Sequence, residues 1–294
     1  MIKNSFFLVI ISLFACNNAT DNSAVSKELA LIDRLKRLDR PMPKPKMEDW
    51  LFEHKEAGQT FEQYQKASPV MPNDTQNCLY IQPIGVFTEG ESKIIDYTAN
   101  YISTFFNLKT VVLTPISDKG IPAKHRRMNA GTEQLQTTYI LDSLLNGVPK
   151  NALATMAITE KDLYPSAAWN FVFGIAYTHK KRAVSSLFRY KKDDYGQLNE
   201  TVCLERLIKT SAHEIAHTFT CLHCIHAQCV MNGSNNMPES DATPNALCSD
   251  CLKKLSWNLG FDNRKRMNDL KAFYQQHGLT RDYKTAAASL DLMR

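Results

Sequence analysis

The stretch that most restricts the fold and chemistry of this chain is SAHEIAHTFTCLHC, residues 211–224. In an α-helix, residues four apart lie on one face, so His213 and His217 can present two imidazoles to a single ion. Zinc binds imidazole nitrogen and prefers four ligands in a tetrahedron. Glu214 follows the first histidine, where its carboxylate can act on water beside the metal without being a ligand. The pattern predicts a helix that carries two zinc ligands and a general base.

The alternative is a pair of surface histidines, because a bare HExxH arises by chance in on the order of one chain in a hundred. His223 argues against this alternative, since it lies six residues beyond His217. A chain that leaves the helix and doubles back at that point can supply a third ligand. We therefore predict that His213, His217 and His223 bind one zinc ion.

Residues 201–219 have the spacing of a long amphipathic helix. Its apolar side chains recur at steps of three and four, at Leu204, Ile208, Ala212, Ile215 and Phe219. At about 100° per residue, His213 and His217 point nearly opposite this stripe. We expect the helix to bury the stripe against a sheet and to turn the histidines toward a cleft.

Four cysteines follow in two close pairs, Cys224 with Cys229 and Cys248 with Cys251. Two such pairs separated by a loop are typical of a structural zinc site with four thiolate ligands. Two disulfides are the alternative, which an exported protein permits. A redox protein that used only the last pair would leave the first pair without a role. We predict a second zinc ion, and one extended segment through His223 and Cys224 can serve both metals.

Three other cysteines need separate interpretations. Cys78 and Cys203 lie in apolar or helical surroundings and are expected to be buried small side chains. Cys221 precedes His223 by two residues, and a competing thiolate at the histidine site is the less favoured interpretation of its position.

The rest of the chain alternates strand and helix patterns. Strands are expected at residues 79–86, 110–113, 153–158, 171–177 and 183–190, and further helices at residues 91–106 and 132–145. A basic turn joins the last two strands, which predicts a hairpin. The succession indicates an α/β (α+β) fold in which helices pack on a mixed β-sheet.

The first residues indicate export. Residues 1–15 combine a positive charge with an apolar run that is too short to span a bilayer and fits a secretory signal peptide. The run ends in Leu-Phe-Ala before Cys16, an order that resembles a bacterial lipoprotein cleavage site. This resemblance implies a lipidated Cys16 and an exported protein anchored to a membrane of the cell envelope. Ordinary secretion and an uncleaved anchor are the alternatives. Residues 16–46 are expected to form a tether with a short amphipathic helix at residues 27–40.

The composition is that of an ordinary globular protein, with 44% hydrophobic and 22% charged residues. The net charge of +5 is small for 294 residues, and the basic residues are interleaved with acidic ones. This distribution argues against a nucleic-acid partner.

Residues 213–251 resemble the archaemetzincin family of metalloproteases. The run HEIAHTFTCLHC is followed by IHAQ and CVM, and Cys248-Ser-Asp-Cys251 closes the motif. The flanking Asp49-Trp50-Leu51, GQTF at residues 58–61, WNFVFG at residues 169–174 and Phe188-Arg189-Tyr190 are also similar to the family. The resemblance implies a metzincin-like catalytic domain at residues 47–280, followed by a C-terminal tail at residues 281–294.

The same resemblance implies roles for individual residues. His213, His217 and His223 would bind the catalytic zinc, with Glu214 as the general base. The four cysteines would bind a structural zinc, and Met231 matches the methionine beneath the metal site. Two zinc ions are therefore expected as cofactors.

One residue departs from the family pattern, because Thr220 occupies the glycine position of the motif. Glycine allows the sharp exit from the helix because it tolerates a positive φ, whereas a β-branched residue there is strained. Either the turn takes another path or the strain is accepted.

The expected function is hydrolysis of peptide bonds in a peptide or protein substrate, with Glu214 moving the proton. An extended substrate could pair with an edge strand, for which residues 183–190 are the candidate. The alternative is a non-catalytic, membrane-tethered module that binds zinc and peptide, which Thr220 and Cys221 favour. The presence of Glu214 opposes that alternative, because binding alone needs no general base.

Overall fold

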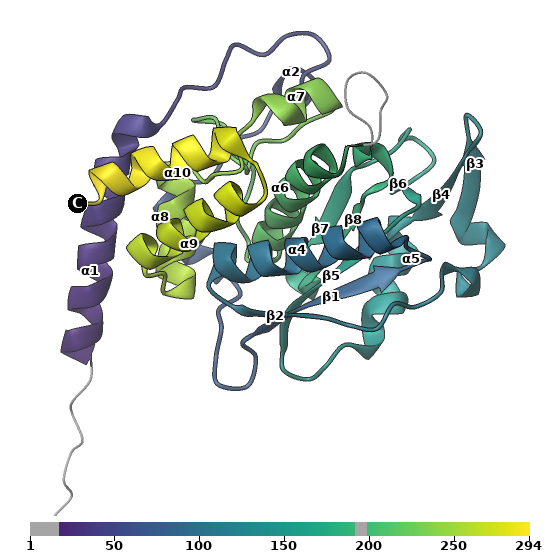
Figure 1. The fold of residues 1–294 in the computed structure, drawn as a ribbon, viewed down its shortest axis with the longest axis horizontal. Coiled ribbons are helices and arrows are strands. Elements are labelled where there is room, and N and C mark those ends of the chain that lie inside the picture. The colour runs from purple at the N-terminus through teal and green to yellow at the C-terminus, as the bar shows by residue number, and fades with distance from the viewer. Residues whose placement is uncertain (1–17, 192–198) are drawn as a thin grey trace, which may run out of the picture.

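A five-stranded mixed β-sheet forms the centre of the fold (Figure 1). The computed structural model describes residues 18–191 and 199–294. The strand order is β2-β1-β5-β8-β7, and only the β7–β8 pair is antiparallel. The five strands are β1 Cys78–Ile84, β2 Lys109–Val112, β5 Ala152–Thr159, β7 Gly174–Tyr177 and β8 Arg182–Ser186. A second sheet in the order β3-β4-β6 consists of β3 Arg126–Asn129, β4 Thr132–Gln136 and β6 Asp162–Tyr164.

The described helices cover the sheet and extend beyond its end. The α-helices are α1 Asn18–Leu35, α2 Trp50–Glu53, α3 Phe61–Lys66, α4 Glu89–Phe106, α5 Thr137–Asp142, α6 Glu200–Thr218, α7 Met237–Ala242, α8 Ser249–Leu259, α9 Asn263–Gln276 and α10 Thr280–Leu292. Short 3₁₀ turns are η1 Lys36–Leu38, η2 Asp118–Gly120, η3 Ala123–His125, η4 Leu144–Gly147, η5 Thr178–Lys180 and η6 Phe188–Tyr190. In Figure 1, α1, α8, α9 and α10 gather at one side of the molecule, away from the strands.

Both faces of the sheet are covered, which explains why every residue of β5 is buried. Along this strand Met156 and Ile158 belong to the larger core, which α4 and α6 complete on one face. Ala157 points the other way, into a smaller core with Ile140 of α5 and Val184 of β8. Because side chains of a strand alternate between faces, one apolar run serves two cores. The predicted fold class, a mixed sheet with packed helices, is confirmed.

Several predicted elements are correct, but two assignments are wrong. The helix expected at residues 132–145 begins as strand β4, which pairs with β3 around Ala130 and Gly131, both at positive φ. The helical part, α5, starts only at Thr137. The predicted hairpin forms, but β8 lies between β5 and β7. Residues 183–190 are therefore not the edge strand, and β7 takes that place.

The C-terminal residues 281–294, for which a tail is expected, form most of α10, which packs against α9 (Figure 1). The expected amphipathic helix at residues 27–40 corresponds to α1 and η1, although α1 begins earlier, at Asn18. The proposed signal peptide and Cys16 lie outside the described residues. Within residues 18–191 and 199–294, no helix combines the length and the apolar composition that crossing a bilayer requires.

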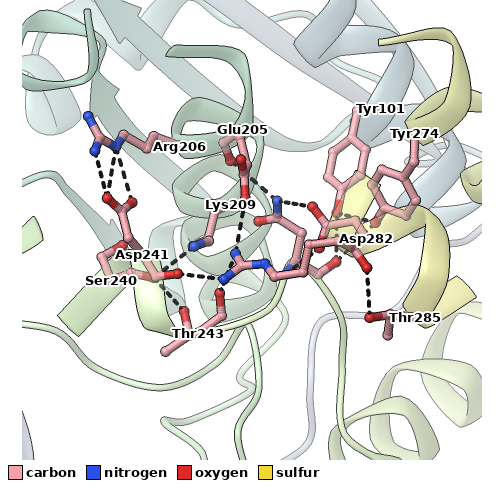
Figure 2. A network of polar contacts seen from close by, with 12 residues as sticks. Tyr101, Glu205, Arg206, Lys209, Ser240, Asp241, Thr243, Tyr274, Asp282 and Thr285 are labelled. Atoms are coloured by element: carbon pink, nitrogen blue, oxygen red, sulfur yellow. Dashed lines mark hydrogen bonds and ion pairs between the residues drawn. The ribbon is translucent and has the colours of Figure 1, made fainter. Parts of the chain in front are cut away.

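A polar network fixes α6 against the C-terminal part of the chain (Figure 2). Arg206 makes a two-point ion pair with Asp241, with nitrogen–oxygen distances of 2.6 and 3.1 Å. One turn nearer the histidines, the buried Lys209 donates its Nζ to the Ser240 carbonyl at 2.7 Å. Burial lowers the pKa of Lys209 to about 8. These contacts hold the helix that carries His213 in one orientation.

Candidate metal centres

Helix α6 presents the histidines because its two faces differ in polarity. The Asn199 side chain caps the helix by accepting the Val202 amide, and the predicted stripe from Leu204 to Phe219 is buried. His213 and His217 lie on the opposite face and are only half-buried. The helix therefore packs one side on the sheet and turns its ligand-bearing side outward, as its periodicity predicts.

The turn that leaves α6 accepts backbone strain at Thr220. Its φ is +68°, in the left-handed region that glycine adopts freely. The Thr220 amide bonds the His217 carbonyl at 2.9 Å, and the Cys221 amide reaches back to the Ala216 carbonyl at 3.2 Å. A non-glycine residue in this region costs about 1–3 kcal/mol. The turn therefore keeps the path that glycine would take, and the strain at Thr220 is accepted.

Three imidazoles converge at one point beyond this turn, and they are called the histidine cluster below. The Nε2 atom of His213 lies 2.9 Å from that of His217 and 3.2 Å from that of His223. A tetrahedral zinc ion with bonds of about 2.0–2.1 Å holds its nitrogens about 3.3 Å apart. The three residues therefore have the separation that one zinc ion requires.

The hydrogen bonds on the other side of each ring fix which nitrogen carries the proton. The Nδ1 atoms of His213, His217 and His223 lie next to the Val230 carbonyl at 2.8 Å, the Cys221 carbonyl at 2.6 Å and the Glu56 carboxylate at 2.8 Å. Each partner is an acceptor, so each Nδ1 must donate and each Nε2 keeps its lone pair.

Lone pairs in such close contact repel one another unless a cation lies between them. Burial lowers the pKa of His213 to about 3 and that of His217 well below its usual value, so these rings are neutral. A metal ion supplies the positive charge that neutral imidazoles lack, and the outer hydrogen bonds are those that orient metal-ligating histidines. The donor set and its surroundings fit zinc.

The Glu214 carboxylate lies on the same helix, buried with 6% exposure. Burial raises its pKa to about 8, and the charge of a bound cation would act in the opposite direction. Gly174 of β7 makes room for it, because a Cβ at that position would lie 2.8 Å from the Glu214 Oε1. The first residue of the edge strand thus contacts the carboxylate that sequence reasoning assigned as general base.

Four thiols form the second group, called the cysteine cluster: Cys224, Cys229, Cys248 and Cys251. All four are buried, and their sulfur atoms lie within 4.8 Å of one another. The 3.6 Å between the Cys224 and Cys248 sulfurs is near the separation of about 3.8 Å in a tetrahedral zinc–thiolate site. Hydrogen bonds from Cys229 and the other two thiols lower the pKa of Cys224, which favours a thiolate ligand.

Asn232 holds the first cysteine pair in place. Its Oδ1 accepts the Cys229 amide at 2.7 Å, and its Nδ2 donates to the Cys224 carbonyl at 2.7 Å. All seven cysteines in the described part of the chain are free thiols, so the disulfide alternative is not realised there.

Known proteins are similar to this chain. The profile of Peptidase family M54 matches residues 124–257. Archaemetzincin-2 of Rattus norvegicus is 34% identical over 272 residues, which cover 79% of this chain and 74% of the rat protein. The chain belongs to the archaemetzincin family. It is therefore a zinc metallopeptidase, a hydrolase that acts on peptide substrates.

Archaeal archaemetzincins are shorter than this chain. That of Archaeoglobus fulgidus is 33% identical over 179 residues, which cover 99% of that protein but 61% of this chain. The crystal structure of the archaemetzincin of Methanopyrus kandleri gives a TM-score of 0.53 at 26% identity and covers 65% of this chain and 99% of that chain. Each of these two alignments thus leaves more than a third of the present chain uncovered.

Predictions from the sequence also concern Cys78, Cys203, Cys221 and Met231. The Cys221 side chain lies near that of Cys251, so it adjoins the cysteine cluster and not the histidine cluster. Cys78 and Cys203 are buried, as expected. Met231 is fully buried, and its carbonyl accepts the Cys224 amide at 2.8 Å.

Sequence reasoning missed the N-terminal contribution to the site. Glu56 bonds His223, and the Trp50 ring lies 5.2 Å from the His223 ring at a near-perpendicular angle. On the outer side His54 stacks parallel to Trp169, with ring centres 6.2 Å apart. No metal-ligand spacing links these residues to the helix motif. Trp50 and Trp169 lie in the family-like flanking segments, whereas Glu56 and His54 lie outside them and have no signal in the sequence.

Proposed function

We propose that His213, His217 and His223 bind one catalytic zinc ion and that Glu214 is the general base of peptide-bond hydrolysis. The observation that carries this proposal is the convergence of three Nε2 lone pairs whose Nδ1 atoms all donate outward. Such a ligand set leaves one tetrahedral position open, as in catalytic zinc sites.

When bound, zinc supplies Lewis-acid chemistry, lowering the pKa of water and polarising the substrate carbonyl. Glu214 accepts a proton from the attacking water and then donates it to the leaving amine. Its carboxylate is buried beside the first histidine, and the charge of a bound ion would oppose the effect of burial on its pKa and keep it ionised for proton uptake. Gly174 keeps the carboxylate free to move, since a larger residue would fill the adjacent space.

The substrate backbone is proposed to pair with β7. This strand lies at one edge of the described five-stranded sheet, and a Cβ on its first residue would lie 2.8 Å from Glu214. An extended peptide added at this edge is proposed to pass beside the Glu214 carboxylate. The exposed Trp169 near the site offers apolar surface for a substrate side chain.

The cysteine cluster is proposed to bind a second, structural zinc ion. Four thiols saturate a tetrahedral ion, so no position remains for substrate. Its role is to fix the loop that begins at Cys224, directly after the third histidine.

Export and membrane anchoring through lipidated Cys16 are also proposed, with residues 1–15 as signal peptide, residues 16–46 as a tether with a short amphipathic helix and residues 47–280 as catalytic domain. The support is the sequence order of charge, apolar run, small residue and cysteine. Mass spectrometry of the membrane fraction tests this: a lipid mass on the mature N-terminus is expected and is lost in Cys16→Ser. An unmodified N-terminus in both proteins would refute it.

The central test counts zinc and activity together. Elemental analysis of the purified protein is expected to give two zinc ions per chain, and one in His223→Ala. The matched control is His226→Ala, an exposed histidine three residues away, which should keep both ions. Cleavage of a synthetic peptide mixture, followed by mass spectrometry, should be abolished only in His223→Ala. Equal zinc content in all three proteins would exclude His223 as a ligand.

A further inference from the structure

Residues 56–64, called the clamp segment, lie against the strained turn that ends α6. The buried Gln59 side chain bonds the backbone on both sides of Cys221, because its Nε2 donates to the Thr220 carbonyl at 3.0 Å and its Oε1 accepts the Leu222 amide at 3.2 Å. One amide side chain therefore satisfies one backbone acceptor and one backbone donor of the turn, the Thr220 carbonyl and the Leu222 amide.

The two ends of the clamp segment extend the same support. Tyr64, which is fully buried, donates its hydroxyl to the Phe219 carbonyl at 2.9 Å, just before the turn. Glu56 accepts the Nδ1 proton of His223 at 2.8 Å, just after it. Phe219, Thr220, Leu222 and His223 are thus held in succession by three side chains of one short segment.

The clamp segment is itself fixed by the helix that carries half of the cysteine cluster. Lys254 of α8, only 2% exposed, donates its Nζ to the Gln59 carbonyl at 2.5 Å. Asn258, one turn further along, donates to the Tyr64 hydroxyl at 2.6 Å. The backbone of Gly58 approaches the loop after His223 so closely that a Cβ would lie 2.8 Å from Ile225. The segment therefore has little freedom to move away.

This arrangement compensates for the missing glycine. Thr220 at φ +68° disfavours the path that brings His223 back to the helix, so the turn alone would populate other conformations. Hydrogen bonds that exist only on the glycine-type path restore its population. We propose that the clamp segment positions His223 for metal binding, with Gln59 holding the Thr220 turn and Glu56 orienting the imidazole. This inference rests on the proposed role of His223 as a zinc ligand.

A double-mutant cycle separates positioning from general packing. Zinc affinity at the histidine cluster is measured on the full chain by competition with a chelator of known affinity. Gln59→Ala is expected to weaken it by about 10–100-fold, because the apparent affinity falls with the fraction of molecules whose turn holds His223 in the binding position. In Thr220→Gly the turn no longer depends on the clamp, so Gln59→Ala/Thr220→Gly should recover most of the loss. Gln65→Ala, an exposed glutamine of the adjoining helix turn, is the matched control and should bind as wild type does.

Different results would contradict the role of Gln59 and the role of His223 as a zinc ligand. An equal loss from Gln59→Ala in both backgrounds would reduce Gln59 to a packing residue, and no loss in either would remove it from the site. A wild-type protein whose zinc content does not respond to His223→Ala would instead overturn the proposed function, independently of the clamp.

Variants of Glu56 test the proposed role of the clamp segment independently of Gln59. Glu56→Ala removes the acceptor of the His223 proton and is expected to weaken zinc binding about 10–100-fold, whereas Glu56→Gln keeps an acceptor oxygen and should retain more of the affinity. Thr220→Gly should not rescue Glu56→Ala, because Glu56 acts on the ring and not on the backbone turn. The exposed Glu53→Ala is the control. Equal losses in the Ala and Gln variants, or a rescue by Thr220→Gly, would contradict this assignment.

Discussion

The histidine and cysteine clusters are joined by the peptide bond between His223 and Cys224, yet their surroundings differ. The four cysteines are at most 4% exposed, whereas the His223 side chain keeps 18% of its surface. The cysteine cluster offers four ligands and the histidine cluster three. A closed, four-ligand site is typical of structural zinc, and an open, three-ligand site of catalytic zinc.

The supports of the two clusters differ in the same way. Asn232, which holds Cys224 and Cys229, lies within the same short loop. In the histidine cluster, His223 and the turn before it instead depend on Glu56 and Gln59, which are far away in the sequence. The first cysteine pair is thus organised locally and His223 by tertiary contacts, so damage to each cluster should have a different signature.

The largest effect is expected from Cys229→Ser. A serine hydroxyl is a poor zinc ligand, and the remaining thiols would be left buried without a saturated ion. We expect the free energy of unfolding to fall by about 4 kcal/mol or more, measured by urea denaturation. Cys203→Ser, a buried thiol outside both clusters, should cost about 1 kcal/mol. Similar losses in the two variants would show that the cysteine cluster holds no structural ion.

The histidine cluster should respond in the opposite way, with lost activity and preserved stability. Glu214→Gln removes the proton acceptor and keeps the side-chain volume. We expect kcat to fall by about 10²–10⁴-fold, while zinc content and the urea midpoint stay unchanged. The exposed Glu200→Gln on the same helix is the control. Activity within tenfold of wild type would exclude Glu214 as the general base.

The contrast between local and tertiary support also explains what the sequence can predict. The helix bearing His213 and His217 follows from periodicity, and the cysteine pairs follow from spacing. Glu56 and Gln59 carry no such signal, because their partners lie more than 160 residues away. The segment at residues 132–145 misleads because Ile140, Leu141 and Leu144 have helix-like spacing, while the Ala130–Gly131 turn commits its first part to a hairpin.

A smaller effect is expected at the contact between the edge strand and the general base. In Gly174→Ala the new Cβ would lie 2.8 Å from the Glu214 side chain and 2.9 Å from the Val184 carbonyl. The backbone contact cannot be relieved by a rotamer change, so stability should fall by about 1–3 kcal/mol. A displaced Glu214 carboxylate should lower kcat about tenfold, within that same energy range. Gly147→Ala, where a Cβ meets nothing within 4 Å, is the control for both assays.

The smallest effect is expected from Thr220→Gly, and its sign tests whether the histidine cluster carries stored strain. Relief of the left-handed conformation contributes about 1–2 kcal/mol, and the added freedom of glycine in the unfolded chain takes back about 0.4–1 kcal/mol. The net gain in the free energy of unfolding should therefore be about 0.5–1 kcal/mol by urea denaturation. Ala130→Gly relieves a similar φ of +47° in the exposed β3–β4 turn and should gain about as much. Because the clamp segment already holds the turn, neither variant should change zinc affinity, and a gain in affinity for Thr220→Gly alone would mean that the clamp leaves part of the strain uncompensated.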